Sequence, residues 1–406
     1  MRNILAALLM LLIIFPAAQA GSASAKTAPP GPEALSQANN LFACRLYQQL
    51  AGQDGNLFFS PFSISSALAM VYDGAKGETA LEMEKALNFP CRGQELTRAL
   101  GGALERLNAL RTQGGAALNI ANSLWPQAGL NLRPDFLARM KQYYQVDMSA
   151  VDYAGNEAGA RRTINAWVAG KTGERIQNLL SFPLAPDTLL LLVNAIYFKG
   201  GWLNPFAPGD SAEEDFYSRG EALKVRMMHK SGPCSYGKNE IMQILELPYA
   251  GKELSFLVIL PRADNPAALA GLEKELSADN LRAWQDLLSY TPEAEISLPA
   301  FKLDWGTASL KEPLAALGMR NVFSGRADFS GLSEAENLNL DDVLHKAVLE
   351  VNEEGSEAAA ATAAVMTRSA RILSPPPRFR ADRPFIFIIK ENAGGGILFM
   401  GRLLRP

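Results

Sequence analysis

The sequence predicts one large folded domain in which helices and strands are mixed. The chain has 406 residues, a formal net charge of −3 and 48% hydrophobic residues, which is typical of soluble globular proteins. Length alone would suggest two or three domains. However, no interior linker rich in Pro, Gly or Ser, no run of charges and no repeat divides the chain. We therefore expect a single domain.

The first 20 residues have the three parts of a secretory signal peptide. Arg2 supplies the positive start, residues 4–15 form an apolar run, and Ala18-Gln19-Ala20 gives a small-x-small cleavage site. The apolar run is too short to span a bilayer. We expect a signal peptide at 1–20, a disordered linker at 21–32 and a folded domain at 33–406. The protein should be secreted or periplasmic, with no membrane attachment after cleavage.

The absence of an Asn-x-Ser/Thr glycosylation site favours a bacterial protein over a eukaryotic glycoprotein.

The spacing of apolar residues predicts the order of the elements. A short buried strand near residue 57 precedes a helix that Pro61 opens and Asp73-Gly74 ends. Other helices are expected at 32–49, 77–87, 132–144, 160–180 and 267–288. Other strands are expected at 117–124, 189–193, 242–248, 254–260, 293–298 and 340–352, with a closing hairpin of 385–389 and 397–400.

The stretch 353–384 allows two interpretations. It begins Glu353-Glu354-Gly355-Ser356-Glu357 and continues into an alanine run. Alanine favours a helix, but Gly355 breaks the start and no capping box follows. With a period of two, the small side chains at 356, 358, 360, 362 and 364 share one face of a strand. Such a strand could slide between two existing strands without clashes.

This stretch resembles the hinge of the reactive-centre loop of inhibitory serpins, and residues 379–389 resemble the carboxy-terminal signature of that family. The resemblance extends from about residue 32 to the end. It implies an α+β fold with three β-sheets, about eight or nine helices and an exposed reactive-centre loop at about 353–383. The residues that match the hinge are Glu353, Glu354, Gly355, Ser356, Glu357, Ala358, Ala359, Ala360, Ala361 and Thr362.

The same resemblance assigns residues beneath the central sheet. Ser60 and Ser63 match the serines of the family's shutter, Asn194 and His345 match its other members, and His345 is expected to hydrogen-bond Asn194. Trp202 matches the tryptophan at the breach, where the hinge first inserts.

One position departs from the family pattern. Many relatives pair the hinge glutamate with a lysine that follows a Leu-Pro pair. That position is Ala300 here, so an ion pair to Glu353 must come from elsewhere.

The resemblance implies suicide-substrate inhibition by a monomer. A serine protease attacks the loop, forms a covalent acyl-enzyme, and is trapped when the hinge inserts into the central sheet. The protein would then not be an enzyme. The usual register places the cut after Ser369, but an arginine suits the anionic pocket of trypsin-like proteases. The candidate bonds, in order of preference, are Arg368–Ser369, Ser369–Ala370 and Arg371–Ile372.

Other functions stay open. Met366 and Ser369 would suit elastase-like or subtilisin-like proteases, and a cysteine protease is another candidate target. A non-inhibitory binding protein with the same fold, or an exported hydrolase that uses a serine and His345, are further alternatives. The five arginines between 368 and 383 indicate a solvated loop or, less favoured, an anionic partner.

The sequence lacks the motifs that are typical of several enzymatic and ligand-binding functions. The chain has only two histidines, His229 and His345, and contains no Gly-x-Ser-x-Gly or His-Glu-x-x-His motif. No glycine-rich phosphate motif or basic aromatic patch is present. We expect no cofactor, no metal and no nucleic acid. The odd set of cysteines, Cys44, Cys91 and Cys234, permits at most one disulfide.

Overall fold

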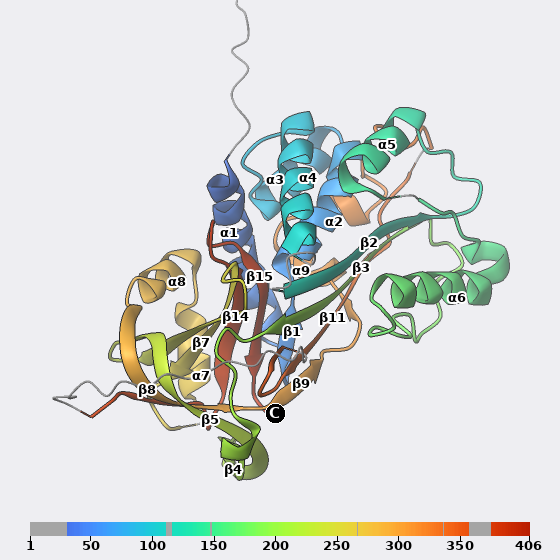
Figure 1. The fold of residues 1–406 in the computed structure, drawn as a ribbon. Coiled ribbons are helices and arrows are strands. Elements are labelled where there is room, and N and C mark those ends of the chain that lie inside the picture. The colour runs from blue at the N-terminus through green and yellow to red at the C-terminus, as the bar shows by residue number, and fades with distance from the viewer. Residues whose placement is uncertain (1–30, 111–115, 147, 266, 336, 357–374) are drawn as a thin grey trace, which may run out of the picture.

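The computed structural model describes residues 31–110, 116–146, 148–265, 267–335, 337–356 and 375–406. The expected signal peptide and most of the linker therefore lie outside the described residues, as do hinge residues 357–362 and every candidate reactive bond. The described residues form nine α-helices and fifteen strands (Figure 1), which confirms the α+β class.

The helices gather around two sheets. Helices α2, α3, α4 and α5 lie together at one end of the molecule, while α7 and α8 lie beside the larger sheet (Figure 1). The helices are α1 (Pro32–Leu50), α2 (Pro61–Gly74), α3 (Gly77–Leu87), α4 (Gly93–Leu110), α5 (Pro134–Arg139), α6 (Tyr153–Lys171), α7 (Ala268–Glu275), α8 (Ala278–Gln285) and α9 (Lys311–Ala316).

The strands range from two to eighteen residues. They are β1 (Leu57–Phe59), β2 (Ala116–Pro126), β3 (Leu190–Gly201), β4 (Ala212–Ser218), β5 (Glu221–Lys238), β6 (Met242–Pro248), β7 (Leu254–Pro261), β8 (Ser289–Pro299), β9 (Phe301–Asp304), β10 (Ala308–Ser309), β11 (Asp342–Val351), β12 (Gly355–Ser356), β13 (Arg378–Arg380), β14 (Phe385–Glu391) and β15 (Ile397–Leu403).

The smaller sheet lies at the centre of the molecule. Strand β3 pairs with antiparallel β2 on one side and with parallel β11 on the other, and β11 also pairs with β9 and β10. Residues 190–198 of β3 are all buried, as expected for an apolar run covered on both faces. Helix α6 covers one face through Ile164 and Val168, and the main core covers the other.

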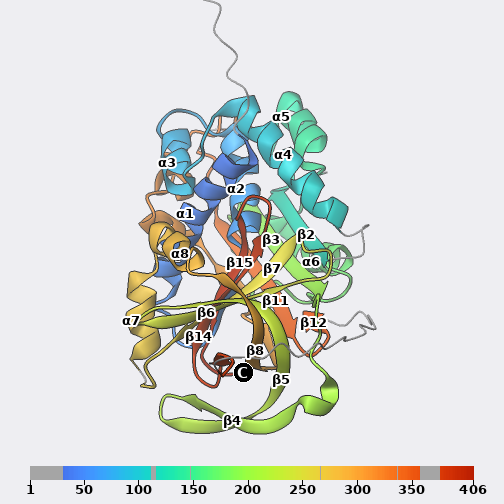
Figure 2. The ribbon, with the colours of Figure 1, turned by 60° about the vertical axis from the view of Figure 1, so that its left-hand side comes forward.

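The larger sheet is continuous but has two parts. Strands β1, β15, β14, β7 and β6 form one part, and β4, β5, β8 and β13 form the other. The long strand β5 joins them because its first half pairs with β4 and its end pairs with β6. The central sheet and these two parts correspond to the three sheets that the family resemblance implied, and among the described residues β5 joins the two parts by hydrogen bonds. Figure 2 shows how the two parts curve around the molecule.

Some predicted boundaries differ from the observed ones for local reasons. The helix expected at 160–180 begins earlier, where Asp152 accepts a hydrogen bond from the Gly155 N–H at 2.8 Å. It ends at Lys171 because Gly173 and Glu174 both adopt positive φ. The helix expected at 267–288 is divided, since Ser277 caps the start of α8. Helices α4 and α9 and strands β4, β5, β9, β10 and β13 were not predicted.

Candidate functional site: the β3–β11 seam and the hinge

The candidate site is the line along which β3 and β11 pair, here called the seam. Residues 342–348 of β11 pair in parallel with residues 191–197 of β3. Two neighbouring parallel strands can be separated by one added strand that runs antiparallel to both. The added strand would then form hydrogen bonds with each of them. The hinge enters the sheet at one end of this seam.

A buried polar network crosses the seam. His345 of β11 lies directly opposite Asn194 of β3. The Ser60 N–H donates to His345 Nε2 at 3.2 Å, so Nδ1 carries the ring proton and donates to Asn194 Oδ1. Asn194 Nδ2 donates to Ser63 Oγ at 2.5 Å. Four residues that the family resemblance grouped as the shutter are therefore in contact around one point of the seam.

Two further residues complete this network. Asn122 lies opposite Asn194 on the β2 side, and accepts a hydrogen bond from Asn194 Nδ2. Asn122 Nδ2 donates to Ser66 Oγ at 3.1 Å. Sequence reasoning missed both residues. The available signals were weak. Asn122 is one of three polar residues in strand 117–124, beside Asn119 and Ser123, and Ser66 is the third serine in the first turns of α2.

The network keeps His345 neutral. The imidazole is completely buried, and this burial lowers the pKa of His345 to about 3. Both ring nitrogens are already bonded within the protein. His345 therefore has neither the access to substrate nor the free nitrogen that a hydrolytic general base requires.

The hinge is already paired with the end of β3. Gly355 and Ser356 form β12, which lies antiparallel to β3 with Gly355 opposite Gly201 and Ser356 opposite Gly200. The main chain just before it is also fixed. Trp202 N–H donates to the Glu354 carbonyl at 2.9 Å, and Trp202 Nε1 donates to the Asn352 carbonyl at 2.9 Å. At these two residues, the strand interpretation of the stretch agrees with the structure.

Close approach explains the small residues at this junction. A Cβ atom on Gly355 would lie 2.1 Å from the Gly200 carbonyl oxygen, and Gly355 has a φ of +154°. Ser356 is fully buried, and its hydroxyl lies 2.7 Å from the hydroxyl of Tyr249. Tyr249 in turn stacks on Trp202, with ring centroids 4.9 Å apart. Larger side chains at 355 or 356 would have to displace backbone or aromatic rings.

Arg226 holds the hinge glutamate from the strand next to Ala300. The Arg226 guanidinium forms an ion pair with Glu353, whose side chain is 12% exposed. Burial is the largest single influence and raises the pKa of Glu353, but the hydrogen bond from Arg226, further hydrogen bonds from Ser211 and the backbone, and the charge of Arg226 together lower that pKa overall. The Ala300 N–H donates to the Arg226 carbonyl at 2.8 Å. Position 300 lacks the lysine that many relatives have, and Arg226 of β5, which is hydrogen-bonded to Ala300, supplies the positive charge instead.

The chain that follows the undescribed loop is anchored in the larger sheet. Strand β13 pairs in parallel with β8, and Arg380 forms an ion pair with Glu214 at 2.6 Å. His229 Nε2 lies 2.9 Å from the same glutamate, and its Nδ1 lies 2.9 Å from Ser297 Oγ. The arginines of this stretch that the structure describes are all paired with carboxylates: Arg378 with Glu295, Arg380 with Glu214 and Asp382, and Arg383 with Asp382.

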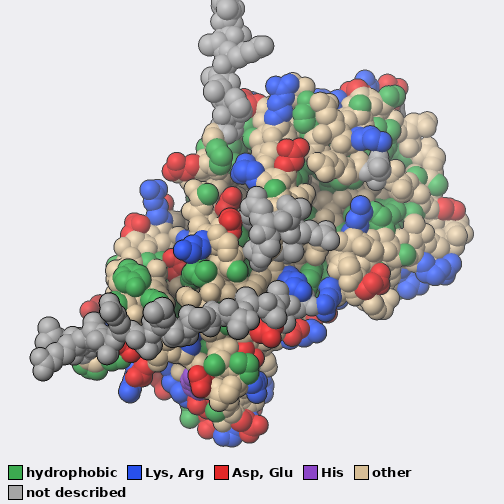
Figure 3. Space-filling model, viewed as in Figure 1, with side chains coloured by type: hydrophobic (Ala, Val, Ile, Leu, Met, Phe, Trp, Pro, Cys, Tyr) green, Lys and Arg blue, Asp and Glu red, His purple; other side chains and the backbone are tan. Residues whose placement is uncertain are grey.

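Other chemical sites are not found among the described residues. None of their helices is long and apolar enough to cross a membrane. No group of three or more His, Cys, Asp or Glu side chains in the described part of the chain could hold a metal ion. Acidic and basic side chains are interspersed over the face shown in Figure 3. The three cysteines are unpaired, and burial raises the pKa of Cys44 to about 12.

Comparison with known proteins identifies the family. The family model described as "Serpin (serine protease inhibitor)" matches residues 37–406. The leukocyte elastase inhibitor of Bos taurus is 42% identical over 389 residues, covering 92% of this chain and 100% of the relative. An uncharacterised serpin-like protein of Thermococcus kodakarensis is 40% identical over 372 residues, covering 90% of this chain and 84% of the relative. The chain belongs to the serpin family, as the resemblance of its motifs implied.

Solved structures show the same fold. Uncleaved ovalbumin superposes with a TM-score of 0.82 at 29% identity, covering 92% of this chain and 100% of that one. Human thyroxine-binding globulin in complex with thyroxine gives a TM-score of 0.81 at 30% identity, covering 92% of this chain and 99% of that one. The bovine relative is named as an elastase inhibitor and this structure is a complex with thyroxine, so membership of the family does not by itself fix the activity.

Acidification should lower the stability of the folded protein because His345 is buried in its neutral form. An unfolded histidine titrates near pH 6.5, whereas the buried His345 binds its proton only near pH 3. Between these values the unfolded state binds more protons, so stability falls as the pH falls. From pH 7 to pH 5, this one group should lower the free energy of unfolding by about 2 kcal/mol. Urea unfolding at both pH values measures the change.

Substitution isolates this effect. His345→Gln keeps a donor and an acceptor but cannot titrate, so this variant should be less stable at pH 7 and should lose about 2 kcal/mol less on acidification. The matched control is His229→Gln, which removes the only other histidine. If His345→Gln loses as much stability on acidification as the parent, then His345 is not the group whose protonation destabilises the folded state.

Proposed function

We propose that this protein inhibits serine proteases as a suicide substrate, and that it does so by inserting residues 357–366 into the seam. The observation that carries the proposal is the pairing of Gly355 and Ser356 with β3. The hinge occupies the first two places of a strand that would lie between β3 and β11. Along the rest of that path, residues 191–197 of β3 pair directly with β11 instead.

The register of β12 predicts the length of the inserted strand. Each further residue of the hinge moves one residue back along β3 from the Ser356–Gly200 pair. Thr362 would then face Asn194, and Met366 would face Leu190, which is the first residue of β3. Arg368 would follow just beyond the end of the sheet. Twelve residues of extended chain span about 40 Å, so an acyl-linked protease would be carried across the whole molecule.

The composition of the loop fits the two faces that this register creates. Positions 358, 360, 362 and 364 would face the main core, because they lie opposite Phe198, Ile196, Asn194 and Leu192. Alanine occupies three of these positions, and small side chains enter a packed core with little overpacking. The exception is Thr362, whose hydroxyl could take over the hydrogen bond that Asn194 loses when His345 moves away.

Insertion should release free energy. It replaces one parallel ladder with two antiparallel ladders, a net gain of about ten backbone hydrogen bonds. At about 1 kcal/mol each, these bonds would stabilise the inserted form on the order of 10 kcal/mol. The intact protein is held back because insertion must first break the buried network around His345. We infer that this barrier, together with the uncut loop, keeps the loop available to a protease.

Two features of the loop bear on the target. Arg368 lies at the distance from the hinge that full insertion requires, and an arginine at the cleaved bond suits trypsin-like proteases. However, the related leukocyte elastase inhibitors are named for an elastase, and Met366 and Ser369 are the residues such a protease would prefer. We favour Arg368–Ser369, with Ser369–Ala370 and Arg371–Ile372 as alternatives.

We propose that residues 1–20 direct export and that the mature inhibitor acts in the periplasm or outside the cell as a monomer. The composition of the leader supports this proposal. When the full chain is expressed in a bacterium with a Sec pathway, the intact mass of the purified protein should correspond to a chain that begins at Gly21. A protein that keeps residues 1–20 and stays in the cytoplasm would contradict export.

A charge placed at Ser356 should convert the inhibitor into a substrate. Ser356 is already fully buried beside Tyr249 in the intact protein, so Ser356→Arg should displace Gly355 and Ser356 from β3. Insertion would force the long cation back into that site, which should cost the inserted form at least 1–3 kcal/mol. The protease should then cleave the loop and leave, so the SDS-stable complex should disappear while the cleaved band increases. Glu354→Arg is the matched control, because position 354 is exposed. Persistence of the complex in Ser356→Arg would contradict insertion.

The cleaved bond can be read directly by mass spectrometry. When the protein is treated with trypsin, the small carboxy-terminal fragment should begin at Ser369. A fragment that begins at Ile372 would move the reactive bond three residues along, and Arg368→Ala would then leave inhibition of trypsin intact. If Arg368→Ala abolishes inhibition of trypsin but not of elastase, both protease classes use this loop at different bonds.

A further inference from the structure

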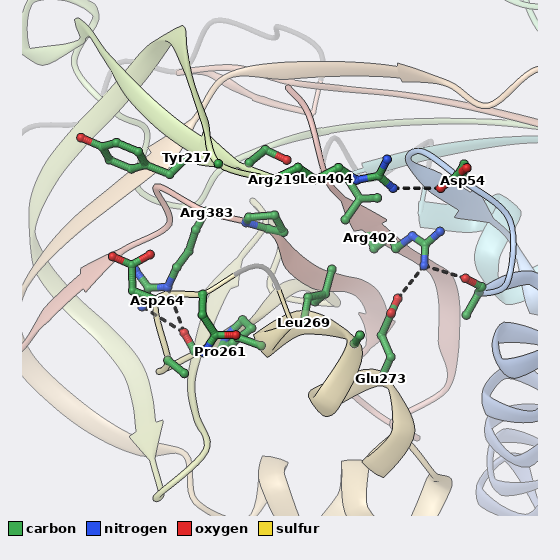
Figure 4. A pocket seen from close by; sticks show the side chains of 18 of the residues that line it. Asp54, Tyr217, Arg219, Pro261, Asp264, Leu269, Glu273, Arg383, Arg402 and Leu404 are labelled. Carbon is green, nitrogen blue, oxygen red and sulfur yellow. Dashed lines mark hydrogen bonds and ion pairs between the residues drawn. The ribbon is translucent and has the colours of Figure 1, made fainter.

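The cavity shown in Figure 4 lies away from the seam and is lined by charges that balance. Its volume is about 480 Å³. Arg219 is paired with Asp54 and Arg402 with Glu273, each pair at 2.9 Å. A lining in which acidic and basic groups neutralise each other indicates no particular class of ligand. The charged group that indicates a further role is instead the Asp341 carboxylate, at the opposite end of the seam from the hinge.

Asp341 bonds the first residues of β3 across the seam. Its Oδ2 accepts hydrogen bonds from the Leu189 N–H at 2.8 Å and from the Leu190 N–H at 3.0 Å. The Asp341 N–H in turn donates to the Leu190 carbonyl at 2.9 Å. Successive backbone N–H groups that converge on one oxygen form a favourable site for a negative charge, and hydrogen bonds to a charged group are stronger than neutral ones. The Asp341 carboxylate and these two N–H groups are here called the clasp.

The clasp lies just beyond the regular pairing of the two strands. That pairing begins with Asp342 of β11 opposite Leu191 of β3, so Asp341 is the residue that precedes β11. On the side of β2, the Leu189 carbonyl accepts a hydrogen bond from the Gln127 N–H at 2.9 Å. The start of β3 is therefore held from both sides. Towards β11, a side chain supplies the acceptor that the main chain supplies along the rest of the seam.

The carboxylate of the clasp is only partly accessible to water. Asp341 is half-buried, and Leu190 is fully buried. Burial, and secondly the charge of Asp341, raise the pKa of Tyr153, which shows that this charge lies close to the first residue of α6. Partly buried charges are screened less than exposed ones. The clasp should therefore contribute measurably to the stability of the form in which it is closed.

The clasp cannot stay closed when a strand lies between β3 and β11. Neighbouring strands of a sheet are about 4.8 Å apart, so an inserted strand would move Asp341 away from Leu190 by about that distance. The two N–H groups would then lie beyond hydrogen-bonding reach of the carboxylate. In the register proposed above, Met366 would lie opposite Leu190, so the clasp is at the place that the inserted strand would reach last.

The neighbouring carboxylate contacts the other side of β11. Asp342 Oδ1 accepts hydrogen bonds from the Ser309 hydroxyl at 2.8 Å and from the Val343 N–H at 2.7 Å. Ser309 belongs to β10, which pairs with β11 on the side away from β3. A strand that enters between β3 and β11 would leave these bonds in place. Two adjacent aspartates therefore differ in whether insertion breaks their contacts.

We propose that Asp341 is a positioning residue that holds the far end of the seam closed in the intact protein and releases β3 when the loop inserts. This proposal rests on the insertion proposed above, and it adds a residue that stabilises only the form before insertion. Asp341 thus reduces the free energy that insertion releases. It also keeps β3 and β11 together at this end until the last residues of the inserted strand replace its bonds.

Thermal unfolding of intact and cut protein tests this role. Asp341→Ala should lower the unfolding temperature of the intact protein by about 3–5 °C, because two hydrogen bonds to a charged group are lost. The same substitution should change that of protein cut once between residues 357 and 374 by less than about 1 °C, since the clasp is already open there. Asp341→Asn keeps an acceptor oxygen without the charge, so its intact form should unfold between those of Asp341→Ala and the parent.

Asp342→Ala is the matched control, because the bonds of Asp342 to Ser309 and Val343 do not cross the seam. This control should lower the unfolding temperatures of the intact and cut forms by equal amounts. If Asp341→Ala also lowers both equally while the cut parent unfolds above the intact parent, the clasp is wrong and insertion stands. A cut parent that unfolds no higher than the intact parent would instead contradict insertion, and with it the proposed function.

Amide hydrogen exchange gives a second test, at the level of single residues. In the intact protein, the amides of Leu189 and Leu190 should exchange at least about tenfold faster in Asp341→Ala than in the parent, because their acceptor is missing. After the loop is cut, both amides should exchange at the same rate in the variant and the parent, since the inserted strand bonds them in either case. Parent rates at both amides in intact Asp341→Ala would show that Asp341 does not hold this end of the seam.

Discussion

The parallel pairing of β3 and β11 is the interaction on which the rest of the structure depends. It joins seven residues of each strand in the middle of the central sheet, where both faces are covered by core. A sheet in which two central strands run parallel can accept one more strand between them without reversing either neighbour. Gly355 and Ser356, which follow β11 along the chain, already pair with the end of β3 as β12, and our proposal is that the residues after them would continue this pairing.

Two sets of polar contacts hold this arrangement, and they differ in burial. The network of Ser60, Asn194 and His345 is completely buried, so each hydrogen bond lost on separating the strands leaves an unpaired group in a dry core. The pair of Arg226 and Glu353 lies at the end of the seam, with the Arg226 side chain 53% exposed. It therefore positions the hinge at little energetic gain. We infer that the buried network sets the barrier and the outer pair sets where insertion begins.

Sequence alone predicted much of this fold because its strongest signals are local. The apolar run in β3, the helix that begins at Pro61 and the closing hairpin each carry their own pattern of apolar residues. Ser60, Ser63, Asn194 and His345 were instead assigned through the resemblance of their motifs to the serpin family. Contacts between distant segments could not be predicted in the same way. Arg226 replaces a lysine from a different strand, and Asn122 joins the network only through its register with Asn194. Asp341 became informative only once the structure showed its carboxylate bonded to the start of β3.

The central claim is that the intact protein is folded with one strand fewer in its central sheet than its sequence can supply. Thermal unfolding of the intact protein and of protein cut once between residues 357 and 374 tests this claim most directly. The account predicts that the cut form unfolds about 10–20 °C higher, because insertion adds on the order of 10 kcal/mol. A cut form that unfolds at or below the temperature of the intact one would contradict the account.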